Sequence, residues 1–121
     1  MAEKLLFQCT HGKDDPERAI LPFVAANVAA IAGQESIVIL TIDAVWLGTK
    51  GGTDGIEKPG FPKLTELYSE FIENGGQVWL CGTCANPRGI TQDHLAEGAR
   101  ITGAARIIEE VINGARSIAF A

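Results

Sequence analysis

Short apolar runs alternate with longer amphipathic stretches along this chain. Residues 4–9 form one such run, and residues 36–42 are rich in β-branched side chains, which is typical of strands buried in a parallel sheet. Between them, residues 16–32 carry apolar side chains at a helical period. Asp15 is the predicted N-cap of this helix, Pro16 suits its first turn, and Gly33 is a suitable stop.

The same alternation continues to the end of the chain. Apolar side chains at residues 64, 67, 68, 71 and 72 share one face of a helix that is predicted to end near Gly75 and Gly76. Further strands are predicted at residues 77–81, 100–102 and 116–120, the second of them at a sheet edge, and further helices at residues 91–98 and 104–112. This order predicts right-handed crossovers and an α/β fold, with a mostly parallel sheet covered by helices on both faces.

The composition fits a single domain over residues 1–121. Apolar residues make up 46% of the chain and charged residues 21%, as in ordinary globular domains. Acidic residues outnumber basic ones by 15 to 10, and the basic ones are scattered, which argues against nucleic acid as a partner. Because no apolar run has the length of a membrane span and the N-terminus does not resemble a signal peptide, we expect a cytoplasmic protein with no membrane partner.

Three of the predicted strands end next to residues that can carry chemistry. Cys9 and His11 follow the first strand, Asp43 follows the second, and Cys81 ends the third. The carboxyl ends of parallel strands meet at one edge of a sheet, where ligands bind. We therefore expect these side chains at the same edge of the molecule, though not necessarily in one pocket.

Residues 81–89, which are predicted to form a loop, hold the Cys-x-x-Cys pair Cys81 and Cys84. A thiol reacts as its thiolate, and Arg88 is close enough in sequence for its guanidinium to reach either sulfur. Gly82 and Gly89 let the backbone bend around a bound group. The spacing fits thiol redox chemistry, metal binding and persulfide transfer alike. The alternative without chemistry is that Cys81 serves only as a small buried apolar residue.

Four segments in the right order resemble the DsrE/DsrF-like family, which includes sulfur-relay subunits of sulfur oxidation and tRNA thiolation. They are VWLCGTCANPRGI at residues 78–90, THGKDDPERA at 10–19, DAVWL at 43–47, and GAA at 103–105 with SIAF at 117–120. The likeness runs along nearly the whole chain. It implies a three-layer α/β/α domain with a five-stranded parallel sheet, flavodoxin-like in general plan. It also implies a homo-oligomer, commonly a trimer or hexamer.

In sulfur-relay members of that family a cysteine at the end of the third strand carries a persulfide, and Cys81 matches its position. The resemblance thus implies a sulfurtransferase without a cofactor, whose partners are sulfur donor and acceptor proteins or small thiols. Cys81 would hold the sulfur, Arg88 would stabilise its anion, and Cys84 could resolve the persulfide to a disulfide. Substrate contacts are expected from His11, Gly12, Asp43, Gly82, Thr83 and Gly89.

Two other classes of function stay open. The same edge could form a non-catalytic ligand- or metal-binding module, with Cys9, His11, Cys81 and Cys84 as a conceivable zinc set. We expect no metal, because Cys9 and His11 lack the usual ligand spacing. An assembly module with inert cysteines is the other class. Five glycines between residues 48 and 60 favour a mobile flap over the cysteine edge, and Trp46 is predicted at a subunit contact.

Overall fold

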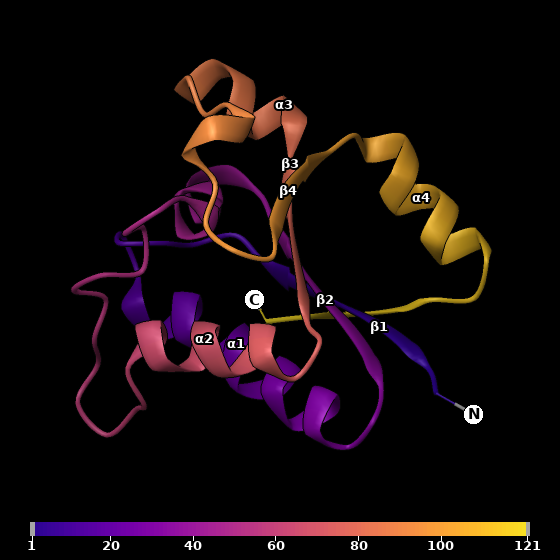
Figure 1. Ribbon diagram of the computed structural model, residues 1–121, viewed down its shortest axis with the longest axis horizontal. Coiled ribbons are helices and arrows are strands. Elements are labelled where there is room, and N and C mark those ends of the chain that lie inside the picture. The colour runs from indigo at the N-terminus through magenta and orange to yellow at the C-terminus, as the bar shows by residue number, and fades with distance from the viewer. Residues whose placement is uncertain (1, 121) are drawn as a thin grey trace.

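The computed structural model describes residues 2–120 and contains a five-stranded parallel sheet with strand order β4-β3-β2-β1-β5 (Figure 1). The strands are β1 (Lys4–Cys9), β2 (Glu35–Leu40), β3 (Gln77–Cys81), β4 (Ala99–Thr102) and β5 (Arg116–Ala119). The helices are α1 (Pro16–Ile31), α2 (Leu64–Glu73), α3 (Gly82–Ala85) and α4 (Ala104–Ile112). The predicted α/β class is confirmed, and β4 lies at a sheet edge as expected.

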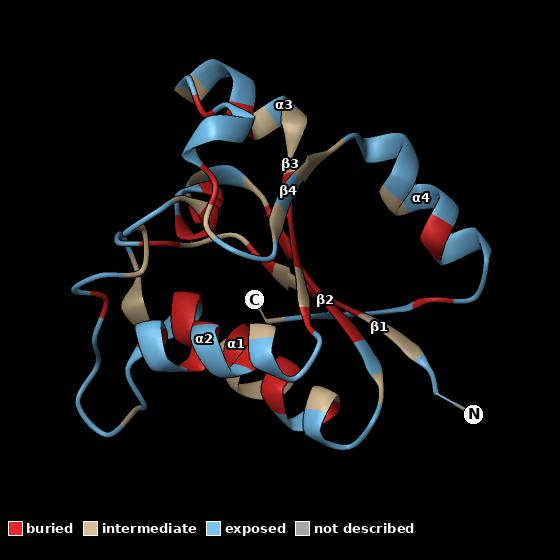
Figure 2. Cartoon of the chain, viewed as in Figure 1, coloured by how far each residue is buried: buried red, intermediate tan, exposed pale blue. Residues whose placement is uncertain are grey.

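Helices cover the two faces of the sheet unequally. Helices α1 and α2 pack side by side on one face (Figure 1). They enclose the larger hydrophobic cluster, in which Phe23 contacts the rings of Tyr68 and Phe71. The smaller cluster, on the α4 face, is formed by Leu6, Ile37, Ile39, Trp79 and Ala115. Helix α4 is mostly exposed, with Glu110 as its one buried residue (Figure 2). The guanidinium groups of Arg100 and Arg106 cover the Trp79 ring.

The ends of the first helix follow from local chemistry. The carboxylate of Asp15 accepts a hydrogen bond from the Arg18 backbone N–H at 3.2 Å, and Pro16 occupies the first turn, so the predicted N-cap is confirmed. Strand β2 ends at Leu40, two residues before the predicted boundary. The reason is Ile42, whose φ of 55° lies in the left-handed region and starts the 3-10 helix η1 (Ile42–Gly48).

Two predictions between β3 and β4 were wrong. Residues 82–88, expected as a loop, form α3 and the 3-10 turn η2 (Asn86–Arg88), which ends at Gly89 with a φ of 72°. The helix expected at residues 91–98 is only the 3-10 turn η3 (Gln92–His94). Backbone bonds to another loop hold the following residues extended: Ala96 N–H donates to Gly48 O and Lys50 N–H to His94 O.

Among residues 2–120, no helix has both the length and the apolar character that a membrane crossing needs.

Candidate functional site

The loops after β1 and β2 meet backbone to backbone at the carboxyl edge of the sheet. A Cβ atom on Gly12 would lie 2.9 Å from the carbonyl oxygen of Asp43, closer than side chains ordinarily approach. Gly12 therefore permits this contact, and any larger residue would separate the two loops. The structure thus brings the predicted site residues Gly12 and Asp43 together, although they lie 31 positions apart in the chain.

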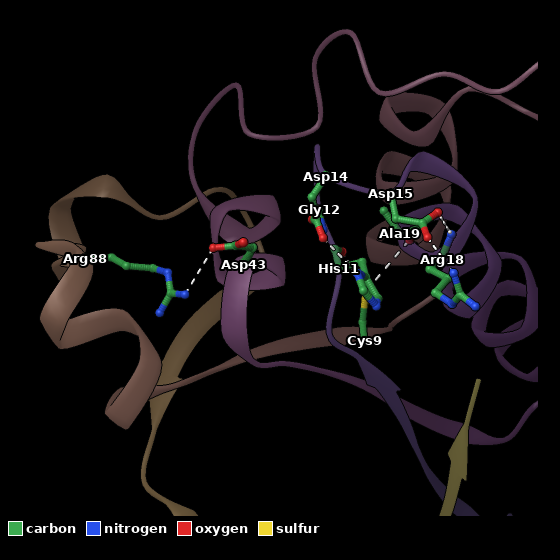
Figure 3. Close-up of polar contacts among 9 residues, drawn as sticks. All are labelled: Cys9, His11, Gly12, Asp14, Asp15, Arg18, Ala19, Asp43 and Arg88. Atoms are coloured by element: carbon green, nitrogen blue, oxygen red, sulfur yellow. Dashed lines mark hydrogen bonds and ion pairs between the residues drawn. The ribbon is translucent and has the colours of Figure 1, made fainter. Parts of the chain in front are cut away.

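Arg88 connects the cysteine segment to this pair of loops. Its Nη2 lies 3.1 Å from Asp43 Oδ1, and its Nη1 donates a hydrogen bond to the Cys84 carbonyl oxygen at 3.0 Å. Figure 3 shows Asp43 between Arg88 on one side and the Gly12–Asp14 loop on the other. The guanidinium therefore fastens the segment after β3 to η1. Its predicted interaction with a cysteine sulfur remains a prediction.

The backbone next to Asp43 is strained. Ile42 is a β-branched residue with a φ of 55°, the one positive φ outside glycine in the described chain. Such a conformation costs about 1–3 kcal/mol and persists only where the surroundings enforce it. Here it redirects the chain from β2 into η1 and sets the Asp43 carboxylate opposite Arg88.

His11 is engaged with its own loop. Its Nδ1 lies 2.8 Å from Asp14 Oδ2, while the Gly12 N–H donates to Asp14 Oδ1 (Figure 3). The His11 contact, followed by the Gly12 N–H, holds the pKa of the Asp14 carboxyl below its usual value. His11 is half-buried and orders the first loop; its predicted contact with a substrate remains a prediction.

Cys9 ends β1, but its thiol is part of the core. The side chain is 1% exposed, and its Sγ lies 3.6 Å from the His11 carbonyl oxygen and 3.9 Å from that of Ala19, so that the S–H can donate to either. Burial raises the pKa of the Cys9 thiol to about 12. Cys9 is therefore a neutral thiol at physiological pH and supplies no thiolate to the sheet edge.

Cys81 and Cys84 lie within one helical turn but relate differently to the core. Cys81 is the N-cap of α3 and is partly exposed. Along β3, Val78 and Leu80 belong to the larger cluster and Trp79 to the smaller one, so strand alternation directs Cys81 to the Trp79 side. Cys84 packs against the larger cluster. A Cys81–Cys84 disulfide would therefore require Cys84 to turn out of that cluster.

A cavity of about 450 Å³ opens between the first loop, η1 and the glycine-rich segment. Its walls are Lys13 and Asp14, then Asp43, Trp46 and Leu47, and residues 49–52 with Asp54. Neither Cys81 nor Cys84 is among them, so the glycine-rich segment contributes to a cavity that the cysteine pair does not line. Its role as a flap over the cysteine edge remains a prediction. The sequence pointed to this segment through its glycines, whereas Lys13, Lys50 and Asp54 carried no signal of their own.

The remaining predicted site residues stay near Cys81 without lining the cavity. Gly82 and Thr83 begin α3, with Thr83 exposed, and Gly89 ends η2. No group of three or more His, Cys, Asp or Glu side chains within residues 2–120 is arranged to hold a metal ion.

The fold and the site define a class: a parallel three-layer α/β protein with a Cys-x-x-Cys pair at the carboxyl edge of its sheet. The model of the DsrE/DsrF-like family matches residues 3–120, and the chain belongs to this family. The predicted family membership is thereby confirmed.

Proteins of other organisms are similar to this chain in sequence or in fold. The uncharacterized protein MJ0760 of Methanocaldococcus jannaschii is 32% identical over 102 residues, which are 84% of this chain but 37% of that protein. This chain therefore spans little more than a third of that relative. The crystal structure of the YchN protein from E. coli matches with a TM-score of 0.79 at 20% identity, covering 98% of this chain and 99% of the other. The Methanobacterium thermoautotrophicum protein MTH1491, of unknown function, matches with a TM-score of 0.73 at 18% identity, with the same coverage.

Proposed function

We propose that this protein is a cysteine-based sulfur carrier in which Cys81 holds a persulfide. The observation that carries the proposal is the contrast among the three thiols. Cys9 is buried and protonated. Cys81 and Cys84 are both partly exposed, but Cys84 packs against the larger cluster, whereas Cys81 lies at the end of β3 and belongs to neither cluster of the described chain. A carrier thiol must be reached by sulfur from both donor and acceptor, and Cys81 meets that requirement best.

The proposed transfer consists of two exchanges at sulfur. The Cys81 thiolate attacks the outer sulfur of a donor persulfide, the donor's S–S bond breaks, and the donor leaves as a thiolate. The outer sulfur keeps its proton or loses it to water. An acceptor thiolate then attacks this sulfur, and Cys81 leaves as a thiolate. Alternatively, Cys84 attacks the inner sulfur and expels hydrosulfide, leaving a Cys81–Cys84 disulfide.

Arg88 fits this scheme as the residue that holds the cysteine segment in place. Its bonds to the Cys84 carbonyl oxygen and to Asp43 connect two stretches of chain that are otherwise far apart in sequence. Pairs of this exposure contribute little to global stability, so their main effect is on the position of the segment. Gly82, Thr83 and Gly89 would contact the incoming sulfur compound through the backbone around Cys81.

The proposal includes a cytoplasmic homo-oligomer, a trimer or hexamer, whose partners are sulfur donor and acceptor proteins or small thiols. Support for self-association comes from α4, where Ile108, Val111 and Ile112 are exposed on the outer side. Apolar side chains gathered on one short helix are uncommon on the surface of a monomer. Light scattering after gel filtration should give a multiple of 12.8 kDa, and an Ile112→Glu variant should shift the mass toward one chain.

Intact-mass spectrometry of the native protein after exposure to polysulfide tests the sulfur-carrier role. Wild type should gain one sulfur atom that dithiothreitol removes, and Cys81→Ser should gain none. Cys84→Ser should gain at least as much as wild type, because it lacks the thiol that would expel hydrosulfide. Cys9→Ala is the matched control for loss of a thiol, because its buried sulfur should not react. Loading that persists in Cys81→Ser, or a wild type that never loads, would contradict the proposal.

A second candidate function, binding of a small organic anion without catalysis, is favoured by the 450 Å³ cavity. Two of its three carboxylates already have partners, since Asp14 contacts His11 and Asp43 contacts Arg88; Asp54 is the third. Its two ammonium groups, Lys13 and Lys50, take part in no ion pair within residues 2–120. Trp46, 45% exposed, supplies a planar apolar surface beside them. An aromatic carboxylate matches this combination of groups.

Trp46 also provides the readout for this second candidate. Because the Trp79 ring is buried under two arginines, benzoate should change the fluorescence of Trp46, whereas benzylamine should not. The double substitution Lys13→Gln and Lys50→Gln should weaken the benzoate response, while Lys63→Gln, which lies outside this cavity, should not. An equal response to benzoate and benzylamine would rule out an anion site.

A further inference from the structure

The hydroxyl of Thr102 is a buried polar group without a partner. Its Oγ1 is closed off from solvent and forms no hydrogen bond within residues 2–120. Buried hydroxyl groups are nearly always paired, because burial strips away the water that would otherwise satisfy them. The other buried atom without a partner within these residues is Oδ1 of Asn27, on α1, whose side chain donates two hydrogen bonds through Nδ2. Thr102 differs because it lies at the candidate site.

Sheet register places Thr102 directly beside Cys81. The two residues are paired across β3 and β4, at the carboxyl end of both strands. Arg100, two residues earlier on β4, lies over the Trp79 ring, while Ile101 packs against the larger cluster. Alternation therefore directs Thr102 to the Trp79 side of the sheet, the side to which Cys81 also points. The hydroxyl and the thiol are neighbours on one face.

This spacing suits a persulfide better than a thiol. Paired residues on adjacent strands lie about 4.8 Å apart, and the Thr102 hydroxyl makes no hydrogen bond to the Cys81 sulfur. A persulfide places a second sulfur about 2 Å beyond the first. An alkyl persulfide is also a stronger acid than the parent thiol, so this outer sulfur is the anionic one and accepts a hydrogen bond strongly.

We propose that Thr102 is the persulfide-binding residue of this site: its hydroxyl donates a hydrogen bond to the outer sulfur of a persulfide on Cys81. The inference rests on the proposed sulfur-carrier function and adds a recognition element to it. The hydroxyl is unpaired while Cys81 is a thiol and becomes paired when the sulfur arrives. Loading is thereby favoured without a change in the reactivity of the empty thiol.

Two pairs of variants isolate the hydroxyl. Thr102→Val removes the oxygen and keeps the shape of the side chain, and it is compared with wild type. Thr102→Ala and Thr102→Ser differ from each other only by the hydroxyl, so this pair decides the question if valine disturbs the fold. Each protein is equilibrated with a fixed ratio of glutathione persulfide to glutathione, and the loaded fraction is read by intact-mass spectrometry. The alkylation rate of unloaded Cys81 by iodoacetamide and the urea midpoint are measured alongside.

The hydroxyl should favour the loaded state about tenfold, the order expected for a hydrogen bond to a charged acceptor. Thr102→Val and Thr102→Ala should therefore show a loading constant about tenfold lower than their partners with a hydroxyl. Their Cys81 alkylation rates should stay within about twofold, because the empty thiol does not use this bond. Equal loading with and without the hydroxyl, in a wild type that does load, would overturn the role of Thr102 alone. A wild type that does not load at Cys81 would overturn the sulfur-carrier function itself, and the role of Thr102 with it.

Discussion

The burial of Cys9 predicts how the stability of the protein changes with pH. Burial raises the pKa of this thiol from 9.0 to about 12. Since the folded-state pKa lies above the unfolded-state value, the stabilising contribution is complete below pH 9 and is lost as the pH rises from 9 to about 12. At pH 10 the unfolded thiol is about nine-tenths ionised while the folded one remains protonated, which lowers the free energy of unfolding by about 1 kcal/mol.

The substitution Cys9→Ala removes this contribution, and urea unfolding at pH 7.5 and pH 10 measures it. Alanine also leaves a small cavity, but that loss is the same at both pH values and cancels when the two conditions are compared. Tyr68, whose pKa burial also raises, titrates in both proteins and cancels in the same way. The denaturant slope is about 2 kcal/mol/M. From pH 7.5 to pH 10, the urea concentration at the unfolding midpoint should therefore fall by roughly 0.5 M more in wild type than in Cys9→Ala.

Cys81→Ser is the matched control, because it removes a partly exposed thiol and leaves Cys9 in place. It should show the full pH dependence of wild type. If wild type and Cys9→Ala lost the same urea midpoint on going to pH 10, the Cys9 thiol would not be held protonated by burial. Cys9 would then be able to supply a thiolate to the sheet edge, contrary to the assignment made from its burial.

Two substitutions away from the cysteine pair should change the stability of the fold. Gly52→Ala should destabilise the protein by about 2 kcal/mol or more and alter the cavity, because its Cβ would overlap the carbonyl oxygen of Trp46. Gly103→Ala is the control, because the space around Gly103 is open and its φ is −85°. In urea unfolding this variant should stay within about 1 kcal/mol of wild type. Glu110→Gln should cost about 1 kcal/mol, because the partly exposed Lys4, whose pKa is raised chiefly by its bond to this carboxylate, keeps only Glu35 as a partner. A cost that is undiminished in a Lys4→Met background would show that the Lys4–Glu110 pair is not its source.

The sequence alone was sufficient for the order and type of most elements. Strands β1 to β5 and helices α1, α2 and α4 lie where apolar periodicity predicted them, with boundaries shifted by one or two residues. The signal is strong in β1, β2, β3, α1 and α2 because these segments are packed into the core, which fixes their period. In α4 and β5 the apolar pattern is present although most of their residues are exposed. Residues 82–98 lack such a period, and there the predicted loop and helix were wrong. Short 3-10 turns are held by bonds to distant backbone, such as that from Ala96 to Gly48, and leave no local pattern.

The sequence by itself determined that Cys9 and Cys81 end parallel strands and that Asp43 lies just beyond another, because residue order and hydrophobic pattern are enough to place strand ends. Only the tertiary structure decided what each of them does there. Burial removes Cys9 from chemistry, Arg88 reaches Asp43 across 45 positions, and the register of β3 against β4 sets Thr102 beside Cys81. Environment and contact between distant residues arise from packing, and packing depends on the whole fold and not on any local run of sequence.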